Sequence, residues 1–205
     1  MADLNYRFDD ITEQYASRPL AEVREYAKNN TLSDQLSMEI GSNKGQFLRG
    51  LAVENPDTFY LGIEIRPKWA SQANESFEKE GISNAHILSA DAFHALPILV
   101  DDGQLKELFV LYPDPWWKAR HRKRRVIQTS NLDMLAKKMS PGAKLWIRTD
   151  VGPLANDMRA DLNAHPEFEP IPLKDYPLDP FPYSERDTLT IKKSLPVQLL
   201  YYQRV

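Results

Sequence analysis

The chain has 205 residues, contains no cysteine and carries a formal net charge of −3. This length suits one domain with a substantial core, and the lack of cysteine excludes disulfides, thiolate metal sites and a cysteine nucleophile. The four histidines lack metal-binding spacing, so no metal site is expected. No signal-peptide pattern opens the chain and no apolar run reaches the length of a membrane span, so we expect a cytoplasmic protein without a membrane segment.

The first part of the chain, residues 1–33, has the pattern of a polar entry segment followed by one amphipathic helix. Ser17 is a suitable N-cap, Pro19 lies in the first turn, and apolar residues recur at helical spacing from Leu20 onward. We expect this N-terminal segment to precede one main domain formed by residues 34–205.

Short apolar stretches with strand character then alternate with stretches of helix length. The expected strands cover residues 36–40, 59–65, 85–89, 108–112 and 144–148. Alternating strand and helix units predict an α/β fold with a mainly parallel sheet, helices on both faces and right-handed crossovers. Pro141-Gly142 is expected to stop the chain before the fifth strand begins.

The C-terminal part has a different character. Residues 166–182 contain six prolines and little periodicity, so we expect a loop that crosses the surface. Two apolar stretches, 187–191 and 197–204, are spaced like a hairpin and predict that an antiparallel strand completes a seven-stranded sheet.

An acidic residue lies at or just past the carboxyl end of each of the first five expected strands. These residues are Glu39, Glu64, Asp91, Asp114 and Asp150. Open α/β sheets bind ligands outside the carboxyl ends of their strands, so the five carboxylates are expected to share one rim. Any one of them is well explained as the cap of the next helix. Five together favour a ligand that is cationic or rich in hydrogen-bond donors.

The first expected strand leads into a loop that contains Gly41 and Gly45, which let the backbone pass close to a ligand, as in nucleotide-binding turns. A tight turn without a ligand is the alternative. Glu64 is placed to accept two hydrogen bonds from a ribose diol. Asp91 and Phe93 could flank an adenine ring, although Phe93 equally suits the core.

A dense basic run, Lys118–Arg125, directly follows the acidic and aromatic turn Tyr112–Trp117. Six of its eight residues are Lys or Arg, and the rest of the chain without them has 20 basic and 29 acidic residues, a charge of −9. Such a patch favours phosphate contacts and a nucleic-acid partner. A solvated helix start is the alternative, but no acidic residue between Asp114 and Asp133 is available to pair with the run.

These motifs resemble the bacterial tRNA guanine-N7 methyltransferases, S-adenosyl-L-methionine enzymes that act on a guanine in the tRNA variable loop. The similarity runs from about Leu36 to the C-terminus, and its most specific part is YPDPWWKARHRKRR. Further shared motifs are MEIGSNKGQFL, YLGIEIRPKW, DAF after the third strand and RTD at the end of the fifth. The resemblance implies a Rossmann-like class I methyltransferase fold, S-adenosyl-L-methionine as cofactor and tRNA as partner. We expect a monomer or homodimer.

The resemblance also implies roles for individual residues. The cofactor site is expected to contain Glu39, Gly41, Gly45, Glu64, Asp91, Ala92 and Asp114, with Asp114 as the active-site residue. The expected substrate contacts are Lys118, Asp150, Ser184, Glu185, Arg186 and Asp187. The expected RNA-binding residues are Arg120, His121, Arg122, Lys123, Arg124 and Arg125. Two positions depart from the family pattern: Arg186 replaces an aromatic residue, and Asn43 or Lys44 replaces a third small residue in the glycine loop.

Guanine N7 carries a free lone pair, so this reaction needs no general base. The enzyme must align N7 with the methyl carbon, exclude water and stabilise the positive charge that grows on the ring. Asp150 and Asp187 could accept hydrogen bonds from guanine N1–H and the 2-amino group, which adenine cannot reproduce. Trp116 or Trp117 could stack on an unstacked base, with core packing as the alternative.

Three other functions compete with this interpretation. A non-catalytic RNA-binding relative would retain the basic run and have an altered cofactor loop. A methyltransferase of small molecules would leave the basic run unexplained. A dehydrogenase fits less well, because the glycine pattern lacks a pyrophosphate cradle.

Overall fold

The computed structural model describes residues 20–32, 36–172, 174 and 183–205. Within these residues, seven strands form one sheet in the order β3-β2-β1-β4-β5-β7-β6. The strands are β1 (Leu36–Ile40), β2 (Tyr60–Glu64), β3 (Ala85–Ser89), β4 (Leu105–Leu111), β5 (Met139–Thr149), β6 (Phe168–Pro170) and β7 (Gln198–Arg204). Strands β1 to β5 run parallel, and β7 is antiparallel to both of its neighbours, which confirms the expected sheet.

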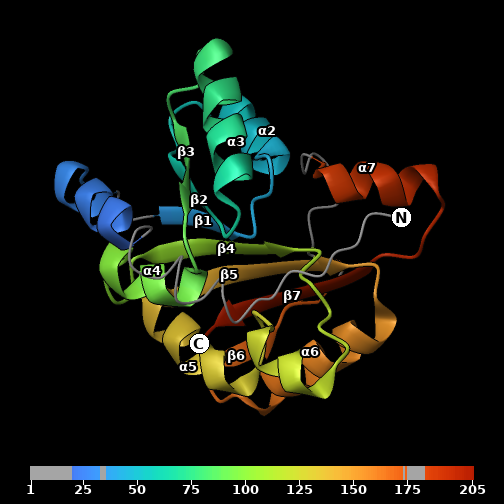
Figure 1. Ribbon diagram of the computed structural model, residues 1–205. Helices are drawn as coiled ribbons and strands as arrows, with labels where there is room; N and C mark the ends of the chain where they lie inside the picture. The colour runs from blue at the N-terminus through green and yellow to red at the C-terminus, as the bar shows by residue number, and fades with distance from the viewer. Residues whose placement is uncertain (1–19, 33–35, 173, 175–182) are drawn as a thin grey trace.

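Helices cover both faces of this sheet (Figure 1). They are α2 (Gln46–Glu54), α3 (Pro67–Lys79), α4 (Ala92–Leu99), α5 (Thr129–Lys138), α6 (Gly152–Ala164), α7 (Glu185–Lys192), the 3₁₀ helix η1 (Ala119–Arg124) and an N-terminal helix over residues 20–29. Helices α2, α3 and α7 lie on one side, and α4, α5 and α6 lie on the other.

Two apolar cores follow from this layering. Strands β1 and β2 are buried along their whole length, as expected for central strands that are covered on both faces. On the α2 and α3 side, aromatic rings pack across the sheet: Phe47 lies edge-on to Phe109, and Trp146 stacks on Tyr201 at 4.0 Å. The other core includes Val23 of the N-terminal helix, which is fully buried. The proposed division at residue 33 therefore stays a prediction.

The expected strand over residues 187–191 is wrong, because these residues belong to helix α7. The Ser184 side chain accepts a hydrogen bond from the Asp187 N–H, and the Asp187 carboxylate accepts one from the Ser184 N–H. This reciprocal capping box starts a helix and outweighs the strand preference of the β-branched residues that follow. The seventh strand is instead β6, which lies in the proline-rich segment that we expected to be a loop.

Pro141-Gly142 does not stop the chain before the fifth strand, because β5 already begins at Met139. The register jumps there: Leu105 pairs with Met139, whereas Glu107 pairs with Lys144. The two turn-forming residues are exposed and sit in this irregularity, as is usual for proline and glycine inside a strand. The expected cap Ser17, Pro19 and residues 173 and 175–182 lie outside the described residues.

Candidate active site

The parallel strands bring the five predicted acids to one edge of the sheet. Glu39 and Glu64 lie at the carboxyl ends of β1 and β2, and Asp91, Asp114 and Asp150 follow β3, β4 and β5. The strand order reverses between β1 and β4. Such a switch point is where open α/β sheets bind their ligands.

Glu64 accepts a hydrogen bond from the backbone of the glycine loop between β1 and α2. Glu64 is 3% exposed, and its carboxylate accepts the Asn43 N–H at 2.8 Å and the Arg66 N–H at 2.9 Å. Asn43 adopts a left-handed φ of 52°, a conformation that asparagine tolerates better than most residues. Two carboxylate oxygens offer about four acceptor sites, so Glu64 retains capacity for hydroxyl donors.

Gly45 is required by close packing as well as by its φ of 74°. A Cβ atom there would lie 2.7 Å from Phe77 Cζ and 2.8 Å from Ile87 Cδ1. The glycine therefore lets α2 begin directly against α3 and β3, which brings the start of that helix to the rim.

Glu39 is a buried acid without a hydrogen-bond donor on one oxygen. The residue is 2% exposed, and its Oε2 atom has no partner among the described residues. Burial raises the pKa of Glu39 to about 8, and the nearby carboxylates of Glu64 and Asp187 add to this rise. Buried polar atoms in folded proteins are almost always satisfied. This oxygen therefore marks a place for a ligand that donates a hydrogen bond.

Glu39 is expected to make the protein less stable as the pH rises from about 4.5 to about 8, because the unfolded chain ionises at the lower value and the folded chain only at the higher one. Each pH unit in this window corresponds to about 1.4 kcal/mol for one group. Glu39→Gln removes the titration, so the free energy of unfolding of the variant minus that of the wild type should increase across this window. Urea denaturation at a series of pH values measures this difference in the free energy of unfolding. A difference independent of pH would contradict the raised pKa of Glu39.

Asp91 caps helix α4, with Oδ1 accepting the Phe93 N–H at 2.9 Å and the His94 N–H at 3.3 Å. Its side chain is 44% exposed. Ala92 is buried, and Phe93 is half-buried against the core below α4.

The turn after β4 is strained at both ends. Tyr112 has a φ of 51° and Trp116 a φ of 44°, and Asp114 lies exposed between them. Left-handed backbone at a non-glycine residue costs about 1–3 kcal/mol and clusters at functional sites. This turn therefore presents the Asp114 carboxylate in a conformation that the surrounding structure must enforce.

Arg125 holds the C-terminal end of this turn. Its Nε donates to the Pro115 carbonyl at 2.9 Å, and its Nη1 donates to Asp157 of α6 at 2.7 Å. The residue is 8% exposed, unlike the rest of the basic run. A search of the sequence for acids near the basic run misses this ion pair, because Asp157 lies 32 residues from Arg125.

The remaining basic residues form an exposed surface beside Asp114. Lys118, Arg120, Arg122 and Lys123 are exposed on and next to η1. Arg124 and His121 contact the half-buried Trp116, the first over its ring face at 5.4 Å and the second edge-on at 5.8 Å. Trp117 is 60% exposed. We call Lys118, Arg120, Arg122, Lys123 and Trp117 the basic surface.

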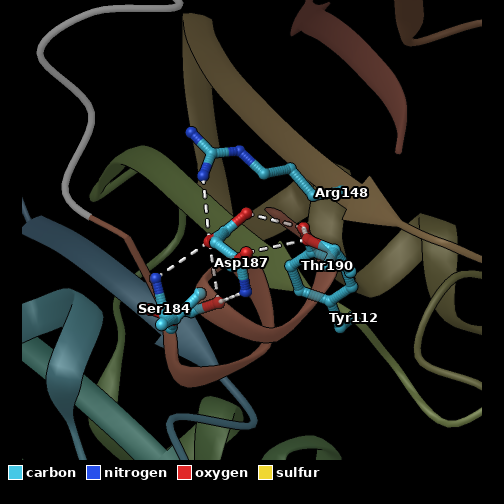
Figure 2. Close-up of polar contacts among 6 residues, drawn as sticks. Tyr112, Arg148, Ser184, Asp187 and Thr190 are labelled. Carbon is cyan, nitrogen blue, oxygen red and sulfur yellow. Dashed lines mark hydrogen bonds and ion pairs between the residues drawn. The ribbon is translucent and has the colours of Figure 1, made fainter. Parts of the chain in front are cut away.

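Asp187 is the centre of a buried polar network (Figure 2). Its Oδ1 accepts the Tyr112 hydroxyl at 2.6 Å, and its Oδ2 accepts the Ser184 N–H at 2.8 Å, the Ser184 hydroxyl at 2.7 Å and Arg148 Nη1 at 3.1 Å. The sequence interpretation missed the roles of Tyr112 and Arg148. Arg148 gave a usable signal, since a charged residue in an apolar strand needs a buried partner.

The first turn of α7 also reaches two other parts of the rim. Arg186 Nη2 donates to Asp150 Oδ2 at the end of β5. Glu185 lies 3.8 Å from Lys44 Nζ in the glycine loop. The structure thus brings Lys44, Asp150 and Ser184–Asp187 together.

Within the part of the chain that the structure describes, no group of three or more metal-ligating side chains is arranged to hold a metal ion. None of the described helices combines the length and apolarity that crossing a membrane requires.

Comparison with known proteins places the chain in a family. Residues 33–194 match the family described as "Putative methyltransferase". The tRNA (guanine-N(7)-)-methyltransferase of Synechococcus sp. (strain JA-2-3B'a(2-13)) is 33% identical over 84% of this chain and 73% of its own length. The corresponding protein of Microcystis aeruginosa is 34% identical over 81% of both chains.

Solved structures share the fold at low sequence identity. The precorrin-6y C5,15-methyltransferase of Geobacter metallireducens superposes with a TM-score of 0.56 at 13% identity, covering 94% of this chain and 95% of that one. TrmN from Thermus thermophilus gives a TM-score of 0.59 at 14% identity, covering 97% of this chain and 52% of that one. From the matched residues and the relatives' identity, the chain belongs to the tRNA (guanine-N(7)-)-methyltransferase family.

Proposed function

We propose that the protein transfers a methyl group from S-adenosyl-L-methionine to N7 of a guanine in the variable loop of tRNA. One observation carries the proposal: the strained turn that presents Asp114 lies on the acidic rim and runs directly into the basic surface. A ligand site for a small cationic molecule and a surface for a polyanion therefore meet at one carboxylate. Family membership supports the same reaction.

The residues of the rim fit S-adenosyl-L-methionine. The unpartnered Glu39 Oε2 suits the ammonium group of the cofactor, and the free acceptor capacity of Glu64 suits ribose hydroxyls. Asp91 and Phe93 would flank the adenine. When bound, the cofactor supplies a methyl group on an electron-poor sulfonium; Glu39, Glu64 and the glycine loop hold and orient it.

Glu64→Ala is expected to weaken S-adenosyl-L-methionine binding by about 1.5–3 kcal/mol, the scale of one charge-assisted hydrogen bond. Calorimetric titration of the cofactor into each variant measures the change. Glu107→Ala is the matched control, because Glu107 also accepts a hydrogen bond within the sheet, from Ser37 at 2.9 Å, but near the opposite ends of the strands. Equal cofactor affinities for the wild type and Glu64→Ala would rule out the ribose role.

Around the base, the two expected acceptors differ in their surroundings. Asp187 already accepts four hydrogen bonds within the protein, so we assign it to positioning α7. Asp150 is bonded to Arg186, whose side chain is 44% exposed and can move. We therefore propose Asp150 as the acceptor for guanine N1–H and the 2-amino group, which gives the site its preference over adenine.

The basic surface would hold the tRNA backbone. Its exposed cations suit phosphates, and the exposed ring of Trp117 offers a stacking face for a base that leaves the RNA stack. Arg125 contributes by holding the turn through Pro115 and Asp157. Cytoplasmic location and a monomeric or dimeric state stay predictions.

One experiment tests the function directly. The protein is incubated with methyl-labelled S-adenosyl-L-methionine and unmodified tRNA, and the tRNA is digested and its nucleosides are identified. We expect N7-methylguanosine from the variable loop. A different methylated nucleoside would overturn the proposal, and tRNA binding without any methylation would favour the non-catalytic RNA-binding alternative.

A further inference from the structure

A single phenol connects helix α7 to the turn that carries Asp114. Tyr112 immediately precedes Pro113-Asp114, and its hydroxyl donates to Asp187 Oδ1 at 2.6 Å (Figure 2). Burial raises the pKa of the Tyr112 phenol above its ordinary value, so the group is a permanent donor near neutral pH.

The backbone of Tyr112 needs this support. Its φ of 51° is rare for an aromatic residue, and a following proline further favours extended backbone at this position. Its N–H donates to the Arg148 carbonyl at 2.7 Å, and its hydroxyl donates to Asp187 and lies 3.5 Å from the Thr190 hydroxyl. Arg148 Nη1 also donates to Asp187. The Asp187 carboxylate of α7 is therefore bonded to residues at the ends of both β4 and β5.

The same carboxylate lies within the part of α7 that reaches the proposed base pocket. Arg186, its neighbour in the chain, is bonded to Asp150, and Ser184 donates both its N–H and its hydroxyl to Asp187. A shift of this first turn of α7 would therefore also move the Asp187 carboxylate. Tyr112, which is bonded to that carboxylate and lies two residues before Asp114, links the carboxylate to Asp114.

We propose that Tyr112 is a positioning residue for methyl transfer: its hydrogen bond to Asp187 aligns the Asp114 turn with the base held at α7. The inference rests on the proposed function and names a further residue for that reaction. It predicts an effect on the chemical step, because small errors in the placement of reacting groups reduce rates strongly. Binding of cofactor and tRNA uses other groups and should be unaffected.

Tyr112→Phe tests the proposal, because it removes only the hydroxyl. The single-turnover rate of tRNA methylation at saturating cofactor and tRNA should fall about 10- to 100-fold, the factor for removing one hydrogen bond to a charged group. Tyr202→Phe is the matched control. This change also removes only a hydroxyl, which donates to Asn163 at 2.7 Å. Tyr202 lies in the core on the α5 and α6 side. The rate of this variant should equal that of the wild type.

A double-mutant cycle separates positioning from a general loss of structure. Asp187→Asn weakens the same link, so the variant that carries both changes should be little slower than the slower single variant. All rates are measured at a temperature at which thermal melting shows each variant to be fully folded.

Three outcomes would overturn the inference: a Tyr112→Phe rate equal to that of Tyr202→Phe, a loss confined to tRNA or cofactor affinity, and fully additive effects in the cycle. Each leaves the wild-type product unchanged. A wild-type product other than N7-methylguanosine would instead overturn the proposed function, so the two failures are distinguishable.

Discussion

Replacing Asp114 by asparagine is expected to slow methyl transfer to tRNA by about 100- to 1000-fold, as for the removal of one electrostatic stabiliser from an active site. Methylation of N7 makes the guanine ring cationic, and the Asp114 carboxylate is the exposed negative charge at the centre of the strained turn. Asparagine keeps the size of the side chain and removes the charge. The loss should therefore appear chiefly in kcat.

Single-turnover methylation with saturating tRNA measures this effect. Asp57→Asn provides a control, because Asp57 is also exposed but lies in the connection between α2 and β2, at the opposite edge of the sheet. An Asp114→Asn enzyme as fast as the control would remove Asp114 from the chemistry. The turn would then have a structural role alone.

The parallel part of the fold was predictable because its strands are mostly apolar stretches separated by helix-length segments. Strands β1 and β2 are buried on both faces, so local hydrophobicity alone marks them. The C-terminal part was not, because two local signals conflict at Asp187: β-branched residues favour a strand, whereas the Ser184 capping box favours a helix. The buried contacts of Asp187 with Arg148 and Tyr112 favour the helix, and neither contact is visible in a local pattern.

The candidate site likewise has a part that could be predicted from the sequence and a part that could not. The acids of the rim follow from the rule that ligands bind at the carboxyl ends of parallel strands, so their shared edge could be predicted. The contacts that fix the turn around Asp114 join residues far apart in the chain: Tyr112 and Asp187 are 75 residues apart, and Arg125 and Asp157 are 32 apart. Charge density along the sequence grouped Arg125 with the cations expected to bind RNA, although its side chain is buried in an ion pair.

Replacing Arg120, Arg122 and Lys123 of the basic surface by alanine is expected to weaken tRNA binding on the order of 100-fold at 0.15 M salt, if each cation binds one phosphate. The plot of log affinity against log salt concentration should become shallower by about 0.7–0.9 for each phosphate that the variant no longer neutralises, because fewer counterions are released on binding. Cofactor affinity should stay the same, since we propose that the cofactor binds at the acidic rim. Filter binding of unmodified tRNA over a series of salt concentrations measures both quantities.

The control is a variant with the same loss of charge elsewhere on the surface. Arg24, Lys28 and Lys79 lie outside the basic surface, on the N-terminal helix and at the end of α3, so replacing them by alanine changes the net charge by the same three units. A local interaction with phosphates predicts a flattened salt dependence only for the first variant, whereas a long-range effect of net charge predicts equal changes in both. An unchanged slope in the first variant would mean that the tRNA binds elsewhere. The guanine would then have to approach Asp114 from a different direction, because the cations next to Asp114 would not bind the RNA backbone.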